Sequence, residues 1–151
     1  MQTLSRREKK KKSGRKKMKR RELREHIFEL LFRVEFNEPE EMPEQLRLFF
    51  EDLGELDGKD QAYMEEKYAR IMEKLPEIDR LLGEAAKSWK VSRMGKTDLA
   101  LLRLAVYEMK YDEDVPVAVA VNEAVELSKK FGGDESPELI NGILGRIGKM
   151  E

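Results

Sequence analysis

The chain has 151 residues, of which 40% are hydrophobic and 40% are charged, and it contains no cysteine. This length suits one domain with a buried core, and the composition is too apolar for a disordered chain and too often interrupted by charge for a membrane span. The lack of cysteine excludes disulfides and cysteine-ligated zinc, and no apolar segment follows the basic N-terminus, so we expect a soluble, cytoplasmic protein.

Charge is distributed unevenly along the chain. Residues 1–24 carry 13 Lys and Arg and two acidic residues, for a net charge of +11, whereas the remainder carries 17 basic and 29 acidic residues, for a net charge of −12. A basic arm on an acidic body attracts polyanions at one end. Lysine runs are also common as solvated tails, so charge alone leaves both nucleic-acid binding and a passive tail open. We expect a flexible basic tail over residues 1–18.

The first predicted helix begins near Lys19 and lasts about four turns. Arg20, Arg21 and Arg24 lie in its first turns, away from the apolar face, where a helix would fix their directions. That apolar face is defined by residues at helical spacing, namely Leu23, Ile27, Leu30, Leu31 and Val34.

Helical spacing continues through the middle of the chain. After a proline-containing loop, a short helix is predicted over residues 44–53 and a longer one over 61–75. Pro76 predicts the first residue of a further helix that runs to residue 89. Residues 97–112 are apolar nearly all the way round, which predicts the central helix of a bundle.

The C-terminal segment predicts two more helices. Residues 116–131 contain alternating valines that would suit a strand, but Pro116 fits a first helical turn and the glycine pair beginning at Gly132 fits a helix stop. The last helix is predicted to open with Ser136 as N-cap and Pro137 at its first position. The sequence therefore predicts an all-α fold of about seven helices with no sheet.

Catalytic and metal-binding patterns are scarce. Lys90 occupies the position where a phosphate-binding loop ending in "MGKT" would need glycine. His26 is the only histidine, which favours a packing role over a triad or a multi-histidine metal site. Glu123 and Glu126 are more typical of a solvated helix face than of a catalytic pair, and Trp89 is more typical of a core than of a stacking site. We expect no enzymatic activity, no cofactor and no metal.

Four blocks of the sequence resemble the NusB transcription antitermination factors. The resemblance covers residues 20–147 and implies a single all-helical domain over residues 19–151, with sub-bundles at about 19–75 and 76–151. It also implies binding of single-stranded boxA RNA together with the small-subunit ribosomal protein that doubles as transcription elongation factor E, within the RNA polymerase antitermination complex on ribosomal RNA operons. The blocks are "RRELREHIFELLF", "DLALLRLAVYEMKY", "VPVAVAVNEAVELSKKFGG" and "SPELINGILGRI".

The resemblance also implies site residues. The family's arginine motif falls on the arginines of the first helix, and the adjoining lysines extend it. The expected RNA-binding residues are Lys16, Lys17, Lys19, Arg20, Arg21, Arg24, Phe32, Asp98, Glu135 and Leu139. The expected protein-partner residues are Asn122, Glu123 and Glu126. Alternatively, Asn122 and Asn141 cap or bridge helices.

Two other functions remain open at this level. Some RNA cytosine methyltransferases carry a similar domain, so the chain could be an RNA-binding accessory to a catalytic chain; it has no cysteine nucleophile and no glycine-rich cofactor loop of its own. A helical protein-interaction module with no RNA role is the third alternative, and it would be indifferent to nucleic acid.

Overall fold

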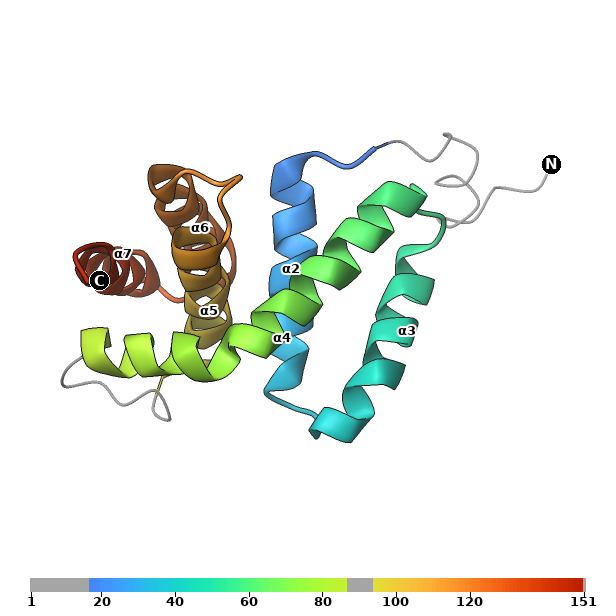
Figure 1. Ribbon diagram of the computed structural model, residues 1–151, viewed down its shortest axis with the longest axis horizontal. Coiled ribbons are helices and arrows are strands. Elements are labelled where there is room, and N and C mark those ends of the chain that lie inside the picture. The colour runs from blue at the N-terminus through green and yellow to red at the C-terminus, as the bar shows by residue number, and fades with distance from the viewer. Residues whose placement is uncertain (1–16, 87–93, 151) are drawn as a thin grey trace. The chain divides into compact units, whose positions relative to one another are not determined.

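The structure is a computed structural model that describes residues 17–86 and 94–150, and every regular element in those ranges is a helix (Figure 1). The all-α prediction is confirmed. Residues 1–16 of the predicted tail, including Lys16, lie outside the described residues, as do Trp89 and Lys90. In chain order the elements are α2 (Arg20–Val34), the short 3₁₀ helix η1 (Pro39–Glu41), α3 (Met42–Leu53), α4 (Gly58–Ala86), α5 (Lys96–Tyr111), α6 (Val117–Phe131) and α7 (Ser136–Gly148).

The chain divides into two compact units between Tyr68 and Ala69, inside α4. The N-terminal unit contains α2, η1, α3 and the start of α4. Its core is formed by the apolar faces of these helices, which follow the predicted helical spacing. Val34 departs from the prediction, because it is only partly buried. The buried side chains include Leu23, Ile27, Phe28, Leu30, Leu31, Met42, Phe49, Phe50, Met64 and Tyr68.

Polar contacts fix α2 against α3. Arg33 donates a hydrogen bond from Nη1 to Oε1 of Gln45 at 3.2 Å, and its guanidinium carbon lies 5.2 Å from the centre of the Phe49 ring. The His26 ring meets the same Phe49 ring edge to face, with 5.9 Å between ring centres. His26 therefore has the packing role that was predicted because it is the single histidine of the chain.

The prediction that Pro76 begins a new helix is wrong, because Pro76 lies inside α4, a single helix of 29 residues. Proline lacks the N–H that would bond to the carbonyl of Met72, and its ring crowds that carbonyl, at a cost of about 3 kcal/mol. Burial on either side outweighs this local penalty, since Ile71, Ile78 and Leu82 are all fully buried at helical spacing. Pro76 itself is exposed, so water can hydrogen-bond to the freed carbonyl.

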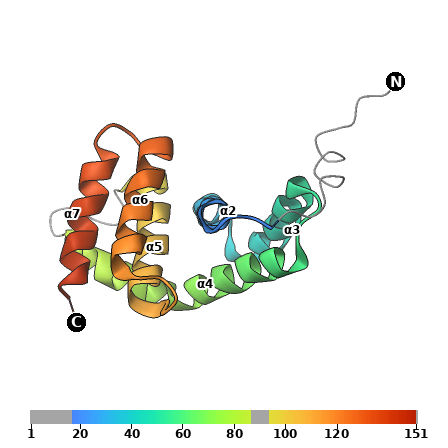
Figure 2. The ribbon, with the colours of Figure 1, turned by 90° about the horizontal axis from the view of Figure 1, so that it is seen from above.

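The C-terminal unit is built around α5, as predicted. All residues from Leu99 to Glu108 are buried. Helix α5 contacts both α6 and α7, which also contact each other, and the three helices run side by side (Figure 2). The part of α4 in this unit is joined to them by polar contacts. Arg103 donates from Nε and Nη2 to the two carboxylate oxygens of Asp79 at 3.0 and 2.9 Å, and Arg146 donates from Nη1 to the Ala85 carbonyl at 2.9 Å.

Helix α6 resolves the ambiguity of the alternating valines. Its buried residues are Ala120, Ala124, Leu127 and Ser128, which is helical rather than strand spacing. The helix prediction is confirmed, although Pro116 is the N-cap and lies just before the first turn in which it was predicted.

Helix α7 begins one residue earlier than predicted. Glu135 is its N-cap, and Ser136 is already the first helical residue. The Ser136 hydroxyl accepts a hydrogen bond from the Gly133 N–H at 3.0 Å, so it holds the preceding turn rather than capping the helix. Leu139 is only partly buried, whereas Ile140 and Ile143 are buried.

Candidate nucleic-acid interface

The basic end of α2 is the first part of the predicted RNA site. Lys17, Lys19, Arg20 and Arg21 are all exposed. Lys19 is the N-cap of α2 and makes no side-chain capping bond, so the start of this helix depends on other contacts. One such contact comes from the backbone N–H of Met18, which donates to Oδ2 of Asp60 at 2.7 Å.

Arg24 does not share this exposure. The sequence placed it away from the apolar face of α2, but the side chain is buried, with only 7% exposed. Arg24 is buried because it shares a helix face with three buried apolar residues. The i, i+3, i+4, i+7 pattern of that face is formed by Arg24, Ile27, Phe28 and Leu31. The expectation that Arg24 lies clear of the core is therefore wrong, and the exposed cationic cluster, defined as Lys17, Lys19, Arg20 and Arg21, excludes it.

Phe32 lies in the middle of a row of three aromatic rings, formed by Phe28 and Phe32 in α2 and by Phe36 in the turn that follows it. Its ring centre is 6.3 Å from that of Phe28 and 4.9 Å from that of Phe36. Phe28 is buried, Phe32 is partly buried and Phe36 is 58% exposed. Phe36 was not singled out from the sequence, although its spacing of four residues from Phe32 was a usable signal.

The other three predicted RNA residues meet in the C-terminal unit. Asp98 comes from the first turn of α5, Glu135 is the N-cap of α7, and Leu139 lies in the first turns of α7. All three line one pocket of about 550 Å³. The remaining lining residues are Met94, Gly95, Gly133, Asp134 and Ser136. Residues far apart in the sequence are thus brought to one concave surface.

This pocket favours ligands that donate hydrogen bonds. Oδ1 of Asp98 is buried and has no hydrogen-bond partner among the described residues, which leaves an acceptor whose desolvation is not compensated there. Asp134 and Glu135 add further carboxylates to the lining and disfavour a phosphate there. Carboxylates accept from exocyclic amino groups of bases, and the ribose 2′-hydroxyl is another available donor. The pocket is suited to a base or a ribose, whereas the exposed cationic cluster of α2 is suited to phosphates.

The turn between α6 and α7 determines where Asp134 and Glu135 are placed, and it is tightly packed. A Cβ atom at Gly132 would lie 2.6 Å from Oγ of Ser136 and 2.9 Å from the carbonyl oxygen of Ser128. That same carbonyl accepts the Gly132 N–H at 2.8 Å. The turn therefore admits no side chain at Gly132.

Substitution of Gly132 by alanine is expected to lower the free energy of unfolding by about 1–3 kcal/mol, because the added methyl group forces the turn apart. Gly133→Ala is the matched control, since a Cβ there meets nothing within 4 Å. Urea unfolding of both variants checks the prediction. Equal stability of the two variants would show that the turn yields to the methyl group.

The predicted protein-partner residues lie on the outer side of α6. Asn122 and Glu126 are exposed, Glu123 is partly buried, and Glu126 forms an exposed ion pair with Lys129 at 3.1 Å. Asn122 and Asn141 are both exposed and lie inside helices, so neither caps a helix, and the alternative that they bridge helices stays a prediction. Val117 and Val119, 49% and 40% exposed, add apolar surface to the start of α6 that the sequence did not single out.

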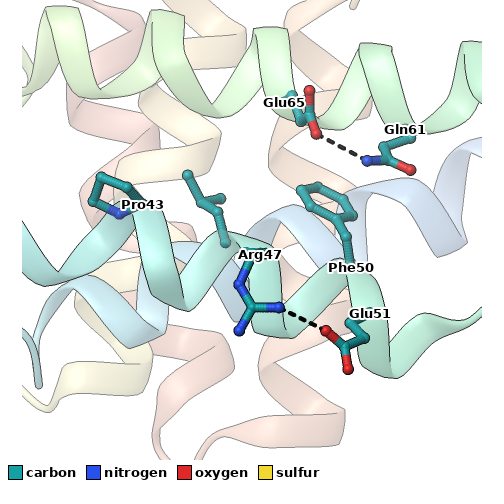
Figure 3. Close-up of a pocket in the computed structure, with 7 residues that line it drawn as sticks. Pro43, Arg47, Phe50, Glu51, Gln61 and Glu65 are labelled. Carbon is teal, nitrogen blue, oxygen red and sulfur yellow. Dashed lines mark hydrogen bonds and ion pairs between the residues drawn. The ribbon is translucent and has the colours of Figure 1, made fainter.

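A second pocket lies in the N-terminal unit between α3 and α4, with a volume of about 480 Å³ (Figure 3). Its polar groups already bond to one another. Arg47 donates to Glu51 at 2.8 Å and to Glu44 at 2.6 Å, and Gln61 donates to Glu65 at 3.0 Å. The Arg47 hydrogen bond lowers the pKa of Glu44. No predicted site residue lines this pocket.

Within residues 17–86 and 94–150, no group of three or more His, Asp or Glu side chains is arranged to hold a metal ion. Over the same ranges, none of the helices combines the length and the apolar character needed to cross a membrane.

Sequence comparison relates this arrangement to known proteins. The profile of the NusB family matches residues 21–149. The chain belongs to the NusB family. Its relatives include the transcription antitermination protein NusB of Lachnoclostridium phytofermentans, 49% identical over 130 residues that cover 86% of this chain and 98% of the relative. The NusB of Agathobacter rectalis is 45% identical over 130 residues, with 86% and 99% covered.

Solved structures agree with this assignment. NusB of T. maritima superimposes with a TM-score of 0.80 at 34% identity, covering 90% of this chain and 94% of that one. A structure of the antitermination factors NusB and NusE in complex with double-stranded RNA superimposes with a TM-score of 0.74 at 21% identity, covering 87% and 97%. At 21% identity, the similarity to the NusB–NusE complex establishes a shared fold and nothing more.

Proposed function

We propose that this NusB-family chain is an antitermination factor that binds single-stranded boxA RNA together with NusE, the ribosomal protein that acts as elongation factor E. The observation that carries the proposal is the convergence of Asp98, Glu135 and Leu139 on one pocket, where a buried Asp98 oxygen has no hydrogen-bond partner within residues 17–86 and 94–150. The naming of its relatives as transcription antitermination proteins supports the same function. Those relatives are matched over nearly their whole length, which favours antitermination over an accessory role for a methyltransferase.

The two parts of the proposed site act differently on RNA. The exposed cationic cluster neutralises phosphates and releases counterions, which contributes affinity with little dependence on sequence. The acidic pocket of the C-terminal unit accepts hydrogen bonds from a base or ribose, which contributes selectivity. The outer side of α6 offers acidic and amide groups, together with exposed valines, to the protein partner. Binding and assembly, rather than a chemical step, are the proposed activity.

A titration of boxA-like and scrambled single-stranded RNA of equal length tests this function. The boxA-like strand should bind more tightly, and addition of NusE should increase the difference. Asp98→Ala should reduce the difference in affinity between the two RNAs. It should leave the salt dependence of binding unchanged, because no phosphate contact is lost. Each lost phosphate contact would change the slope of log binding constant against log salt concentration by about 0.7. Fluorescence anisotropy across a salt series provides both quantities. Equal affinity for both RNAs, with and without NusE, would contradict the proposal.

A further inference from the structure

Asp60 is a buried acidic residue whose hydrogen bond reaches the basic segment. It lies in the first turn of α4 and is only 3% exposed. Its Oδ2 accepts the backbone N–H of Met18 at 2.7 Å, a contact between residues 42 positions apart. A carboxylate is costly to bury, and a charge-assisted hydrogen bond to an amide offsets part of that cost.

The surroundings of Asp60 make this contact well defined. The start of α4 is held by Asp57, whose Oδ1 accepts the Lys59 N–H at 2.7 Å and the Asp60 N–H at 3.4 Å. The first turn of a helix also favours a negative charge. Asp60 is therefore presented from a capped helix end.

The other end of the contact is the part of the chain that carries the cations. Met18 lies directly between Lys17 and Lys19, and Arg20 begins α2; these three neighbours are exposed. Lys19 provides no side-chain cap, so the bond from Met18 is a tertiary restraint at the entry to α2. Because Asp60 bonds to the backbone amide of Met18, this contact restrains the segment without using the cationic side chain of Lys17, Lys19 or Arg20.

We propose that Asp60 is a positioning residue for nucleic-acid binding: by holding the Met18 amide it fixes the backbone from Lys17 to Arg20 and presents their cationic side chains to phosphates in advance. The inference rests on the proposed RNA-binding function. A segment that is already ordered loses less conformational entropy when it binds, so affinity rises without any new contact to the RNA.

If Asp60 has this role, its removal should weaken RNA binding, whereas the change in net charge alone would strengthen it. Removal of an acidic residue makes the protein more positive, which alone would strengthen binding to a polyanion. Loss of the restraint instead weakens binding. Asp60→Ala should lower affinity for single-stranded RNA by about tenfold, because residues next to Met18 must then be ordered on binding. Asp60→Asn, which keeps an acceptor oxygen, should lower it less.

Glu65→Gln is the matched control. It removes one negative charge from the same helix at an exposed position and keeps the acceptor for Gln61. It should leave RNA affinity unchanged or raise it slightly. Amide hydrogen exchange supplies a readout that does not depend on RNA: Met18 protection should fall about tenfold in Asp60→Ala and stay unchanged in the control.

A second pair of variants tests the contact from its other side and serves if Asp60→Ala does not fold. Met18→Pro removes the donor N–H, whereas Met18→Ala removes the side chain and keeps the donor. Only the proline variant should weaken RNA binding. In the double variant Met18→Pro/Asp60→Ala the loss should be no greater than in either single variant, because the two changes break one interaction.

The outcomes separate this inference from the proposed function. If the parent binds no RNA, the proposed function fails and this inference fails with it. If the parent binds RNA but folded Asp60→Ala binds equally or more tightly, or Met18→Pro binds like Met18→Ala, the positioning role alone is overturned. Weakened binding with an unchanged Met18 exchange rate would also overturn it, since the restraint would then not be the cause.

Discussion

Replacement of Asp79 by alanine is expected to lower the free energy of unfolding by about 3 kcal/mol, near the lower limit for breaking a buried ion pair. The substitution leaves the Arg103 guanidinium, whose side chain is 10% exposed, without its bidentate partner inside the C-terminal unit. Asp79 is itself 32% exposed, so water screens part of its attraction to Arg103. The loss of stability should therefore not reach the roughly 5 kcal/mol that a fully buried ion pair can contribute. Urea unfolding followed by circular dichroism measures the change.

The neighbouring residue provides the control for this prediction. Arg80 pairs with Glu77 at 3.1 Å and with Glu84 at 2.7 Å, but all three side chains are more than half exposed. Arg80→Ala should therefore leave stability almost unchanged, although it breaks two ion pairs instead of one. The double variant Asp79→Leu/Arg103→Met should recover most of the loss, because it removes both partners of the ion pair together. Equal effects of Asp79→Ala and Arg80→Ala would contradict the assigned difference in burial.

The second large effect concerns RNA. Arg20→Ala and Arg21→Ala, made together, should weaken boxA binding by about 1–3 kcal/mol for each arginine, since a guanidinium can hold a phosphate bidentately or stack on a base. Both residues are exposed, so the thermal midpoint should hardly change. Arg→Lys at both positions should restore only part of the affinity, because charge returns without the planar fork.

Arg24 should behave in the opposite way. Its side chain is buried and has at least one interaction partner within the structure, so Arg24→Ala should lower the free energy of unfolding by about 2 kcal/mol. Melting and binding curves of the two sets of variants distinguish the roles. A stable Arg24→Ala variant with weak RNA binding would show that Arg24 contacts RNA directly.

Most of the fold follows from local patterns in the sequence. The spacing of Leu23, Ile27 and Leu30 predicts the inner face of α2, and the nearly continuous apolar run from Leu99 predicts the central helix α5. These predictions succeed because helical periodicity is a local property. The predicted helix start at Pro76 is wrong because the penalty of a proline is local, whereas the burial of Ile78 and Leu82 that outweighs it comes from tertiary packing.

The candidate site was predictable to a smaller degree. Residues such as Asp98 and Leu139 were named through the family resemblance, and nothing in their local sequence indicates that they line one pocket. The exposure of Val119 and the burial of Arg24 depend on which neighbours cover each helix face. The contact between Asp60 and Met18 joins distant positions through a backbone amide, which leaves no side-chain pattern to recognise.

The position of the unit boundary inside α4 restricts how this protein can be divided or recombined. A break between Tyr68 and Ala69 would cut a continuous helix and create two new ends, each with up to four backbone groups lacking intrahelical partners. Pro76 would then be the eighth residue of a shortened helix, at the start of its third turn. Exchange of halves between relatives is therefore expected to succeed when the junction is placed in the loop before Gly58, which keeps α4 whole, rather than at the boundary between the compact units.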